Sequence, residues 1–234
     1  MQKEAIILAG GLGSRLQNVV KDIPKPMADI NGQPFLKFLL DYLSIYQIER
    51  IILSVGYKYE VIEKYFGRKY RNIELVYAVE DEPLGTGGGI LNACKHLNSN
   101  LFYLINGDTF FDVNLDELKT FHLLQKADFT LAIKPMNNFD RYGTVEISKN
   151  RILKFNEKRY MKSGLINGGV YLLDKNKLQS LAFPLKFSFE KEFLEHYISS
   201  YFFAAFECNN YFIDIGIPDD YLLAQHELEK FSSF

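Results

Sequence analysis

Several features that mark specialised protein classes are scarce or missing in this sequence. Only two cysteines occur in 234 residues, and Cys94 and Cys208 lie far apart without metal-ligand spacing. A disulfide-stabilised scaffold is therefore excluded, and a reduced, cytoplasmic protein is expected. The nearest candidate for a membrane span, residues 198–206, has nine uncharged residues, against the roughly 20 that a membrane-spanning helix needs. No membrane partner is expected.

An excess of basic residues is also missing. Lysine and arginine total 27 and aspartate and glutamate total 29, which gives a formal net charge of −2. A dedicated nucleic-acid binder usually carries a basic excess, so no nucleic-acid partner is expected. A local basic site for phosphorylated small molecules stays open. The 47% hydrophobic and 24% charged residues are typical of a globular protein and disfavour disorder and coiled coils.

What the first half does contain is an alternation of apolar strands and helical patterns. Such alternation predicts an α/β fold whose parallel sheet is covered on both faces. The predicted strands are residues 4–9, 50–55, 73–79, 101–106 and 129–134, and the predicted helices are 35–46, 59–66, 89–97 and 115–125.

The second half is less regular, but no proline- or serine-rich linker separates it from the first. We therefore predict one domain, residues 1–234, in which the second half packs onto the same sheet. The predicted strands are residues 144–147, 152–156, 169–173, 202–206 and 211–214, and the predicted helices are 189–199 and 219–231.

A glycine-rich segment directly follows the first strand. Gly10, Gly11 and Gly13 let backbone N–H groups approach an anion closely, at the strand end where α/β proteins bind ligands. A tight turn without a ligand is the alternative. Leu16 stands where the Rossmann fingerprint needs glycine, and no Gly-Lys-Ser/Thr sequence forms a Walker A loop. Arg15 lies two residues after Gly13 and could hold a polyphosphate with several hydrogen-bond donors.

A lysine between two prolines forms the next candidate. In Pro24-Lys25-Pro26 the prolines are expected to hold Lys25 in an extended segment, which presents its ammonium group without a large conformational loss. A lone surface lysine would be merely solvated. Its position near the glycine-rich segment favours a functional lysine.

Three further segments end predicted strands. Residues 80–89 contain four glycines among their last five and are interpreted as a ligand-approaching loop, with a merely flexible loop as the alternative. Asp108 ends the fourth strand and Asp214 lies between a strand and a helix start. Such carboxylates could hold a hard cation such as Mg²⁺ together with phosphate oxygens, whereas helix capping is the alternative.

These motifs together resemble the nucleotidyltransferases that make nucleotide-diphosphate sugars. The family signature Gly-Gly-x-Gly-x-Arg followed by Lys-Pro matches residues 10–15 and 25–26. Residues 21–27 and 82–88 are most similar to D-glycero-α-D-manno-heptose 1-phosphate guanylyltransferases, which serve bacterial surface polysaccharides such as capsule and lipopolysaccharide. The resemblance implies a Rossmann-like three-layer sandwich with a mostly parallel central sheet. It also implies a nucleotide-binding half, residues 1–134, and a sugar-phosphate-binding half, residues 135–234.

The resemblance further implies a role for each matching residue. Arg15 would bind the departing pyrophosphate, Lys25 the α-phosphate, and Lys158 the sugar phosphate. Asp108, counted among the catalytic residues, and Asp214 would hold the cofactor Mg²⁺. Arg159 stands where the family usually has proline, so residues 159–164 are expected to be looser than is usual in the family. The implied nucleotide contacts are Leu8, Ala9, Gly10, Gly11, Gly13, Ser14, Glu80, Gly85, Thr86, Asn106 and Gly107. The implied sugar-phosphate contacts are Tyr142, Gly143, Glu157, Lys158, Asn167 and Gly168.

The expected substrates are a nucleoside triphosphate and a sugar 1-phosphate. An ionised phosphate oxygen attacks the α-phosphorus, so neither a general base nor a nucleophilic side chain is needed. In the family, the residue at Glu80 reads the base, and a carboxylate can accept from both N1–H and the 2-amino group of guanine. GTP is therefore favoured.

Other outcomes stay open at this point. Mannose or glucose 1-phosphate could replace the heptose, with GTP, UTP or CTP as the nucleotide. A non-catalytic nucleotide-sugar-binding regulator is a second alternative, although the intact charged motifs oppose it. Homo-oligomers are compatible with each of these readings.

Overall fold

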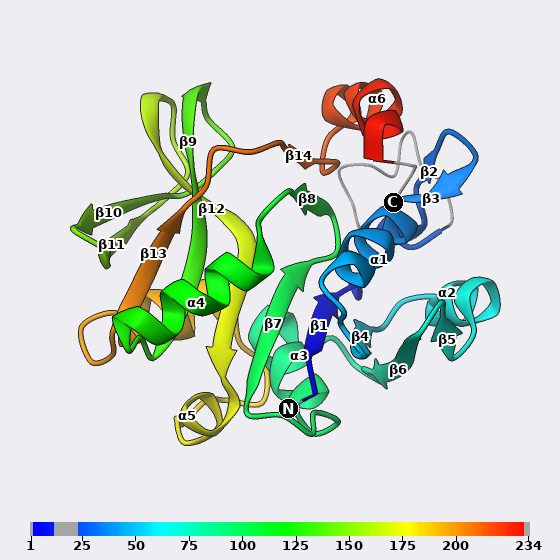
Figure 1. Cartoon of the computed structure of the whole chain (residues 1–234), viewed down its shortest axis with the longest axis horizontal. Helices are drawn as coiled ribbons and strands as arrows, with labels where there is room; N and C mark the ends of the chain where they lie inside the picture. Colours follow the sequence, from blue (N-terminus) through cyan, green and yellow to red (C-terminus); the bar gives the residue numbers. More distant parts are fainter. Residues whose placement is uncertain (1, 12–22, 232–234) are drawn as a thin grey trace.

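The computed structural model describes residues 2–11 and 23–231, and in these residues a central sheet is enclosed by helices (Figure 1). The sheet has ten strands in the order β10-β11-β13-β9-β12-β7-β1-β4-β6-β5. Its strands from the first half are β1 (Glu4–Leu8), β4 (Arg50–Val55), β5 (Lys69–Tyr70), β6 (Ile73–Val79) and β7 (Leu101–Asn106). Those from the second half are β9 (Phe129–Phe139), β10 (Thr144–Ser148), β11 (Arg151–Asn156), β12 (Met161–Asp174) and β13 (Phe203–Glu207).

Smaller elements surround this sheet. Two short ribbons pair β2 (Asp29–Ile30) with β3 (Gln33–Pro34), and β8 (Thr109–Phe111) with β14 (Phe212–Asp214). The α-helices are α1 (Phe35–Ile45), α2 (Tyr59–Phe66), α3 (Gly85–Cys94), α4 (Leu115–Gln125), α5 (Lys175–Gln179) and α6 (Pro218–Glu227). Single turns of other helix types are η1 (Lys25–Met27), the π-helix η2 (Phe189–Glu195) and η3 (Leu228–Phe231).

The predicted three-layer α/β sandwich is confirmed by the apolar packing on the two faces of the sheet. Ala5 and Ile7 of β1 belong to one buried cluster, and Ile6 between them belongs to the other. The first cluster includes the apolar sides of α1 and α4, and the second includes those of α3 and η2. Alternate residues of a strand point to opposite faces, so a strand as apolar as β1 must be covered on both sides.

The parallel strands of the first half lie side by side in the sheet. β7, β1, β4 and β6 are mutually parallel, whereas β12 runs antiparallel to β7 and to β9. The chain passes from β1 to β4 and β6 on one side, and then returns to place β7 on the other side of β1. The ends of β1 and β7 therefore meet where the strand order reverses, which is the usual ligand position in such sheets.

The second half extends the same sheet, as predicted, but its strands are longer than the sequence indicated. β9 continues to Phe139 and β12 begins at Met161, where the sequence predicted residues 129–134 and 169–173. Met161 and Gly164 pair with Phe139 and Met136. Residues 161–164 are thus paired with β9, and whether residues 159–164 are looser than is usual in the family stays a prediction.

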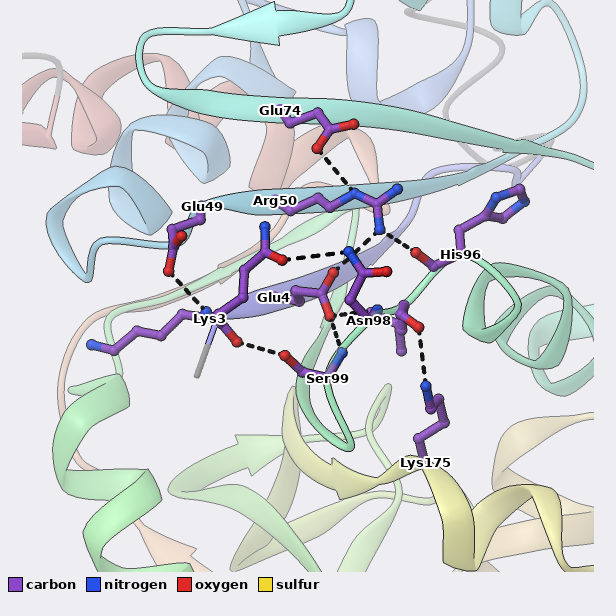
Figure 2. A network of polar contacts seen from close by, with 11 residues as sticks. Lys3, Glu4, Glu49, Arg50, Glu74, His96, Asn98, Ser99 and Lys175 are labelled. Carbon is purple, nitrogen blue, oxygen red and sulfur yellow. Dashed lines mark hydrogen bonds and ion pairs between the residues drawn. The ribbon is translucent and has the colours of Figure 1, made fainter.

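A buried polar network closes the edge of the sheet where β1 begins (Figure 2). The Glu4 side chain is 0% exposed, and its Oε2 accepts hydrogen bonds from the backbone N–H groups of Asn98 (2.8 Å) and Ser99 (2.5 Å). Arg50 Nη1 lies 3.3 Å from Glu4 Oε1, and Arg50 Nε lies 3.1 Å from Glu74. The network ties β1, β4 and β6 to the segment before β7, at the ends of the strands opposite Gly10 and Asp108.

In the described part of the chain, no helix is long and apolar enough to cross a membrane.

Candidate active site

Two adjoining cavities open at the carboxyl ends of the parallel strands. Cavity A has a volume of about 790 Å³ and is lined mainly by the second half of the chain. Cavity B has a volume of about 720 Å³ and is lined mainly by the first half. Four residues line both cavities, so the two form one cleft: Lys25, Asn106, Asp108 and Glu190.

Most of the residues predicted for the site line this cleft. Cavity A is lined by Lys25, Asn106, Asp108, Tyr142, Gly143, Glu157, Lys158, Asn167, Gly168 and Asp214. Cavity B is lined by Leu8, Gly10, Gly11, Lys25, Glu80, Gly85, Thr86, Asn106, Gly107 and Asp108. The structure therefore brings together segments that are more than 200 residues apart in the sequence.

Four predicted residues are not placed at the cleft. Ala9 is 2% exposed, and its N–H donates to the Ser54 carbonyl at 2.8 Å, so this side chain belongs to the core. Gly13, Ser14 and Arg15 lie outside the residues that the structure describes.

The loop after β7 requires glycine for a steric reason. The Gly107 N–H donates to the Leu8 carbonyl at 3.0 Å. A Cβ at position 107 would lie 2.3 Å from that same carbonyl oxygen, which is closer than real Cβ atoms come. Glycine therefore lets the ends of β1 and β7 converge, and this convergence places Asp108 beside Gly10 and Gly11.

The glycines at 85–89 have a different role from the one predicted. They form the start of α3 instead of a loop, so the helix begins at Gly85 and not at residue 89. A Cβ on Gly87 would lie 2.1 Å from the Phe187 ring, and one on Gly88 would lie 2.6 Å from the Leu185 carbonyl oxygen. The interpretation that all of these glycines approach a ligand is thus wrong, because Gly87 and Gly88 admit the segment before η2.

Glu80 directly follows β6, and its carboxylate is fixed at cavity B. One oxygen accepts from the Leu84 N–H at 2.9 Å, and the other lies 3.2 Å from the donating Ser54 hydroxyl. A Cβ on Gly89 would lie 2.5 Å from this carboxylate. The side chain is half-buried and remains on the cavity wall. Glu80 is thus a pre-positioned hydrogen-bond acceptor.

Lys25 occupies the junction of the two cavities. Its Nζ lies 2.5 Å from Asp108 Oδ2, and its side chain is 13% exposed. The expected extended segment is wrong, because residues 25–27 form a 3₁₀ turn in which the Met27 N–H donates to the Pro24 carbonyl at 2.8 Å. The fixed φ of proline suits the first turn of a helix, so the two prolines set a turn that directs the lysine into the cleft.

Asp214 joins this pair through the short ribbon. β14 pairs with β8 so that Asp214 lies opposite Thr109, and the Ile215 N–H donates to the Asp108 carbonyl at 3.0 Å. Burial raises the pKa of Asp214, and the nearby charge of Asp108 raises it further, whereas Lys25 opposes the shift. The cluster of Lys25, Asp108 and Asp214 therefore places two carboxylates at close range around one ammonium group.

This carboxylate pair fits a hard divalent cation that is shared with a ligand. Carboxylate oxygens are what Mg²⁺ prefers, and Mg²⁺ usually takes one or two of them together with phosphate oxygens. A cation would also relieve the repulsion that raises the Asp214 pKa. Across residues 2–11 and 23–231, no three His, Cys, Asp or Glu residues are grouped as a metal site. Asp108 and Asp214 would therefore supply only part of a coordination shell, and phosphate oxygens of a ligand would supply more.

The far wall of cavity A combines exposed charges with fixed polar groups. Glu157 and Lys158 lie exposed just after β11. The Asn167 amide donates to the Tyr171 hydroxyl at 2.8 Å and accepts from the Gly169 N–H at 3.2 Å. Burial and the charge of Asp214 raise the pKa of Tyr142, which keeps its hydroxyl protonated as a donor. The wall therefore offers both donors and acceptors to a polar ligand.

Sequence reasoning missed one part of this wall. The start and one side of η2 line cavity A with Ser188, Glu190, Lys191, Leu194 and Glu195. The sequence predicted an ordinary helix over 189–199, which gave no reason to assign it to a site. The one available signal was the alternation of charged and apolar residues in this helix, which shows an exposed face but not what that face meets.

Comparisons with known proteins agree with this geometry. The nucleotidyl transferase family model matches residues 4–230. This chain is 49% identical to each of two D-glycero-α-D-manno-heptose 1-phosphate guanylyltransferases, from Aneurinibacillus thermoaerophilus and Campylobacter jejuni. The match to the first covers 97% of this chain and 99% of the relative. The match to the second covers 93% of this chain and 96% of the relative. The crystal structure of HddC from Yersinia pseudotuberculosis complexed with GMP-PN is 39% identical with a TM-score of 0.87, and covers 99% of this chain and 100% of that one. The chain belongs to the nucleotidyl transferase family.

Proposed function

We propose that the protein transfers the guanylyl group of GTP to D-glycero-α-D-manno-heptose 1-phosphate, which yields GDP-heptose and pyrophosphate. The observation that carries this proposal is the cluster of Lys25, Asp108 and Asp214 at the junction of two cavities. A reaction between two bound substrates needs its charged groups where the two binding sites meet. The relatives named as heptose 1-phosphate guanylyltransferases support the choice of substrates.

The two cavities support a division between the halves of the chain. In this proposal, residues 1–134 hold the nucleotide in cavity B and residues 135–234 hold the sugar phosphate in cavity A. The backbone N–H groups of Gly10 and Gly11 would bind phosphate oxygens, and Lys158 would bind the sugar phosphate. Arg15 is assigned to the pyrophosphate on the family resemblance alone.

The chemistry is an in-line displacement. An oxygen of the sugar phosphate forms a bond to the α-phosphorus of GTP as the bond between the α-phosphorus and the bridging oxygen breaks, and the electron pair leaves with pyrophosphate. Bringing the negatively charged sugar phosphate and GTP phosphates together is costly, because two like unit charges 4 Å apart repel by about 1 kcal/mol in water and about 4 kcal/mol near a protein surface. Lys25 offsets this repulsion at the α-phosphate, and fixed positioning lowers the barrier further.

A divalent cation, with Mg²⁺ the proposed one, would be held by Asp108 and Asp214. Bound there, it would neutralise charge on the phosphate oxygens. Within the chain itself, Lys25 lies 2.5 Å from Asp108 and orients that carboxylate. The Gly216 N–H donates to Asp214 at 2.7 Å and fixes the second carboxylate. A cytoplasmic location and a role in surface polysaccharide synthesis stay predictions.

Release of pyrophosphate tests this function. The purified chain would be assayed with Mg²⁺ and each pairing of GTP, UTP, CTP or ATP with heptose, mannose or glucose 1-phosphate. We expect the highest kcat/KM for GTP with heptose 1-phosphate. A clear preference for another pairing would replace the proposed substrates, and no release with any pairing would favour a binding protein.

A further inference from the structure

Glu190 holds a position that no other acid outside the Lys25 cluster shares in the described residues. It lines cavity A and cavity B, whereas the other cavity-lining residues of η2 line cavity A alone. One oxygen, Oε2, accepts from the Thr86 hydroxyl at 3.0 Å and from the Ser188 hydroxyl at 2.9 Å. The Thr86 hydroxyl in turn accepts from the Phe189 N–H at 2.8 Å. The carboxylate is therefore anchored between the first turn of α3 and the start of η2.

Cavity A is lined by more acidic side chains than basic ones. Its lining contains three lysines and five acids. Asp108 and Asp214 fit a cation, which leaves Glu157, Glu190 and Glu195 in a cavity assigned to an anion. Ionised carboxylates only accept hydrogen bonds, so they repel phosphate oxygens and attract hydroxyl groups. This surplus of acids fits the polyol part of a sugar phosphate.

The surroundings of Glu190 favour the sugar over the ribose of the nucleotide. Glu190 and Tyr171 line the same cavity, and burial, followed by the charge of Glu190, raises the pKa of the Tyr171 hydroxyl. Tyr171 in turn holds the Asn167 amide at 2.8 Å, on the wall of cavity A. Both hydrogen bonds of the Glu190 carboxylate within the described chain fall on Oε2, which leaves Oε1 as an acceptor.

We propose that Glu190 determines sugar specificity by accepting a hydrogen bond from a hydroxyl of the sugar 1-phosphate through Oε1, while Thr86 and Ser188 fix the carboxylate through Oε2. The inference rests on the proposed function, because it takes cavity A to be the sugar-phosphate site. Through Thr86, the same carboxylate links the sugar site to the first turn of α3 at cavity B. Glu190 is thus a substrate contact that the family motifs in this sequence do not include.

The test compares Glu190→Gln with a matched variant in the same helix, Glu192→Gln. Glu192 accepts from the Ser188 N–H at 2.6 Å and supports the start of η2, but it lines neither cavity. For each protein, the dissociation constant of heptose 1-phosphate is measured by calorimetry, and KM is measured for heptose 1-phosphate and for GTP. A hydrogen bond to a charged group is worth about 1.5–3 kcal/mol, or about 10- to 150-fold.

We expect Glu190→Gln to weaken heptose 1-phosphate binding at least about tenfold while the KM for GTP changes less than about twofold. Glu192→Gln should leave both values near those of the wild type. Equal effects of the two variants would assign Glu190 a merely structural role, and a raised KM for GTP alone would place it on the ribose; either result overturns the proposal. If the wild type binds heptose 1-phosphate in a Glu190-dependent way but releases no pyrophosphate, the proposed function fails and this inference stands. No binding by the wild type would overturn both.

Discussion

The assignment of guanine recognition to Glu80 makes a quantitative prediction about base selection. The carboxylate is already fixed by the Leu84 N–H at 2.9 Å and by the Ser54 hydroxyl at 3.2 Å, so little ordering is needed on binding. Guanine offers two adjacent donors to it, whereas hypoxanthine lacks the 2-amino group. One hydrogen bond to a charged group is worth about 1.5–3 kcal/mol. The wild type should therefore prefer GTP over ITP by about 10- to 150-fold in kcat/KM.

The variant Glu80→Gln keeps the shape of the side chain and removes its charge. Its amide group carries donors that oppose those of guanine, so the preference for GTP over ITP should fall to less than about threefold. The ratio of the two kcat/KM values is measured within one protein, and general damage to the fold cancels. Asp81→Asn, a change of charge at the neighbouring residue of cavity B, should keep the wild-type ratio. An unchanged preference in Glu80→Gln would refute guanine reading by Glu80.

Two further predictions concern stability. Glu4→Ala leaves two backbone donors and Arg50 without their buried acceptor, so the free energy of unfolding in urea should fall by about 3–5 kcal/mol. Glu74→Ala removes the 57% exposed partner of the same arginine, so it should lower the free energy of unfolding by at most about 1 kcal/mol. Equal losses in the two variants would contradict the importance of the buried Glu4 contacts. Burial, with the nearby charge of Lys177, lowers the pKa of His122, which is 4% exposed and lies 2.8 Å from the Thr130 hydroxyl. As the pH falls, the unfolded chain therefore binds a proton at His122 before the folded chain does. The contribution of neutral His122 to the free energy of unfolding is complete above about pH 6.5 and is lost as the pH falls toward the lower pKa of the folded state. Between pH 7 and pH 5, the free energy of unfolding in urea should fall less for His122→Gln than for the wild type. If the free energies of the two proteins fell equally with pH, His122 would be excluded as a source of the pH dependence.

The sequence predicted the parts of the site that depend on local chemistry. Gly10 and Asp108 each follow an apolar strand of the parallel sheet, and such strand ends meet at one edge of the sheet. Asp214 ends a short apolar strand too, but it reaches this edge through the antiparallel β8–β14 ribbon. The fold class followed in the same way from the alternation of strands and helices. What the sequence could not show was the antiparallel extension by β9 and β12, because strand order depends on contacts between distant residues.

Two of the errors share this origin in distant contacts. Gly87 resembles a loop glycine until Phe187, one hundred residues later, is placed against it. Glu190 belongs to a helix without a motif, and only the fold brings it to Thr86. For Lys25 the error was local, since the prolines permit both an extended segment and a turn, and the Met27–Pro24 hydrogen bond decides for the turn.

The central claim is that the charged cluster at the junction of the two cavities stabilises the reacting phosphates. Lys25→Met tests it most directly, because this change removes the ammonium group that lies 2.5 Å from Asp108 and keeps an unbranched side chain. The measurement is kcat for pyrophosphate release at saturating GTP and heptose 1-phosphate. We expect kcat to decrease about 10²- to 10³-fold, which is the effect of removing one charge-stabilising group from an active site. A kcat within about threefold of the wild type would contradict it.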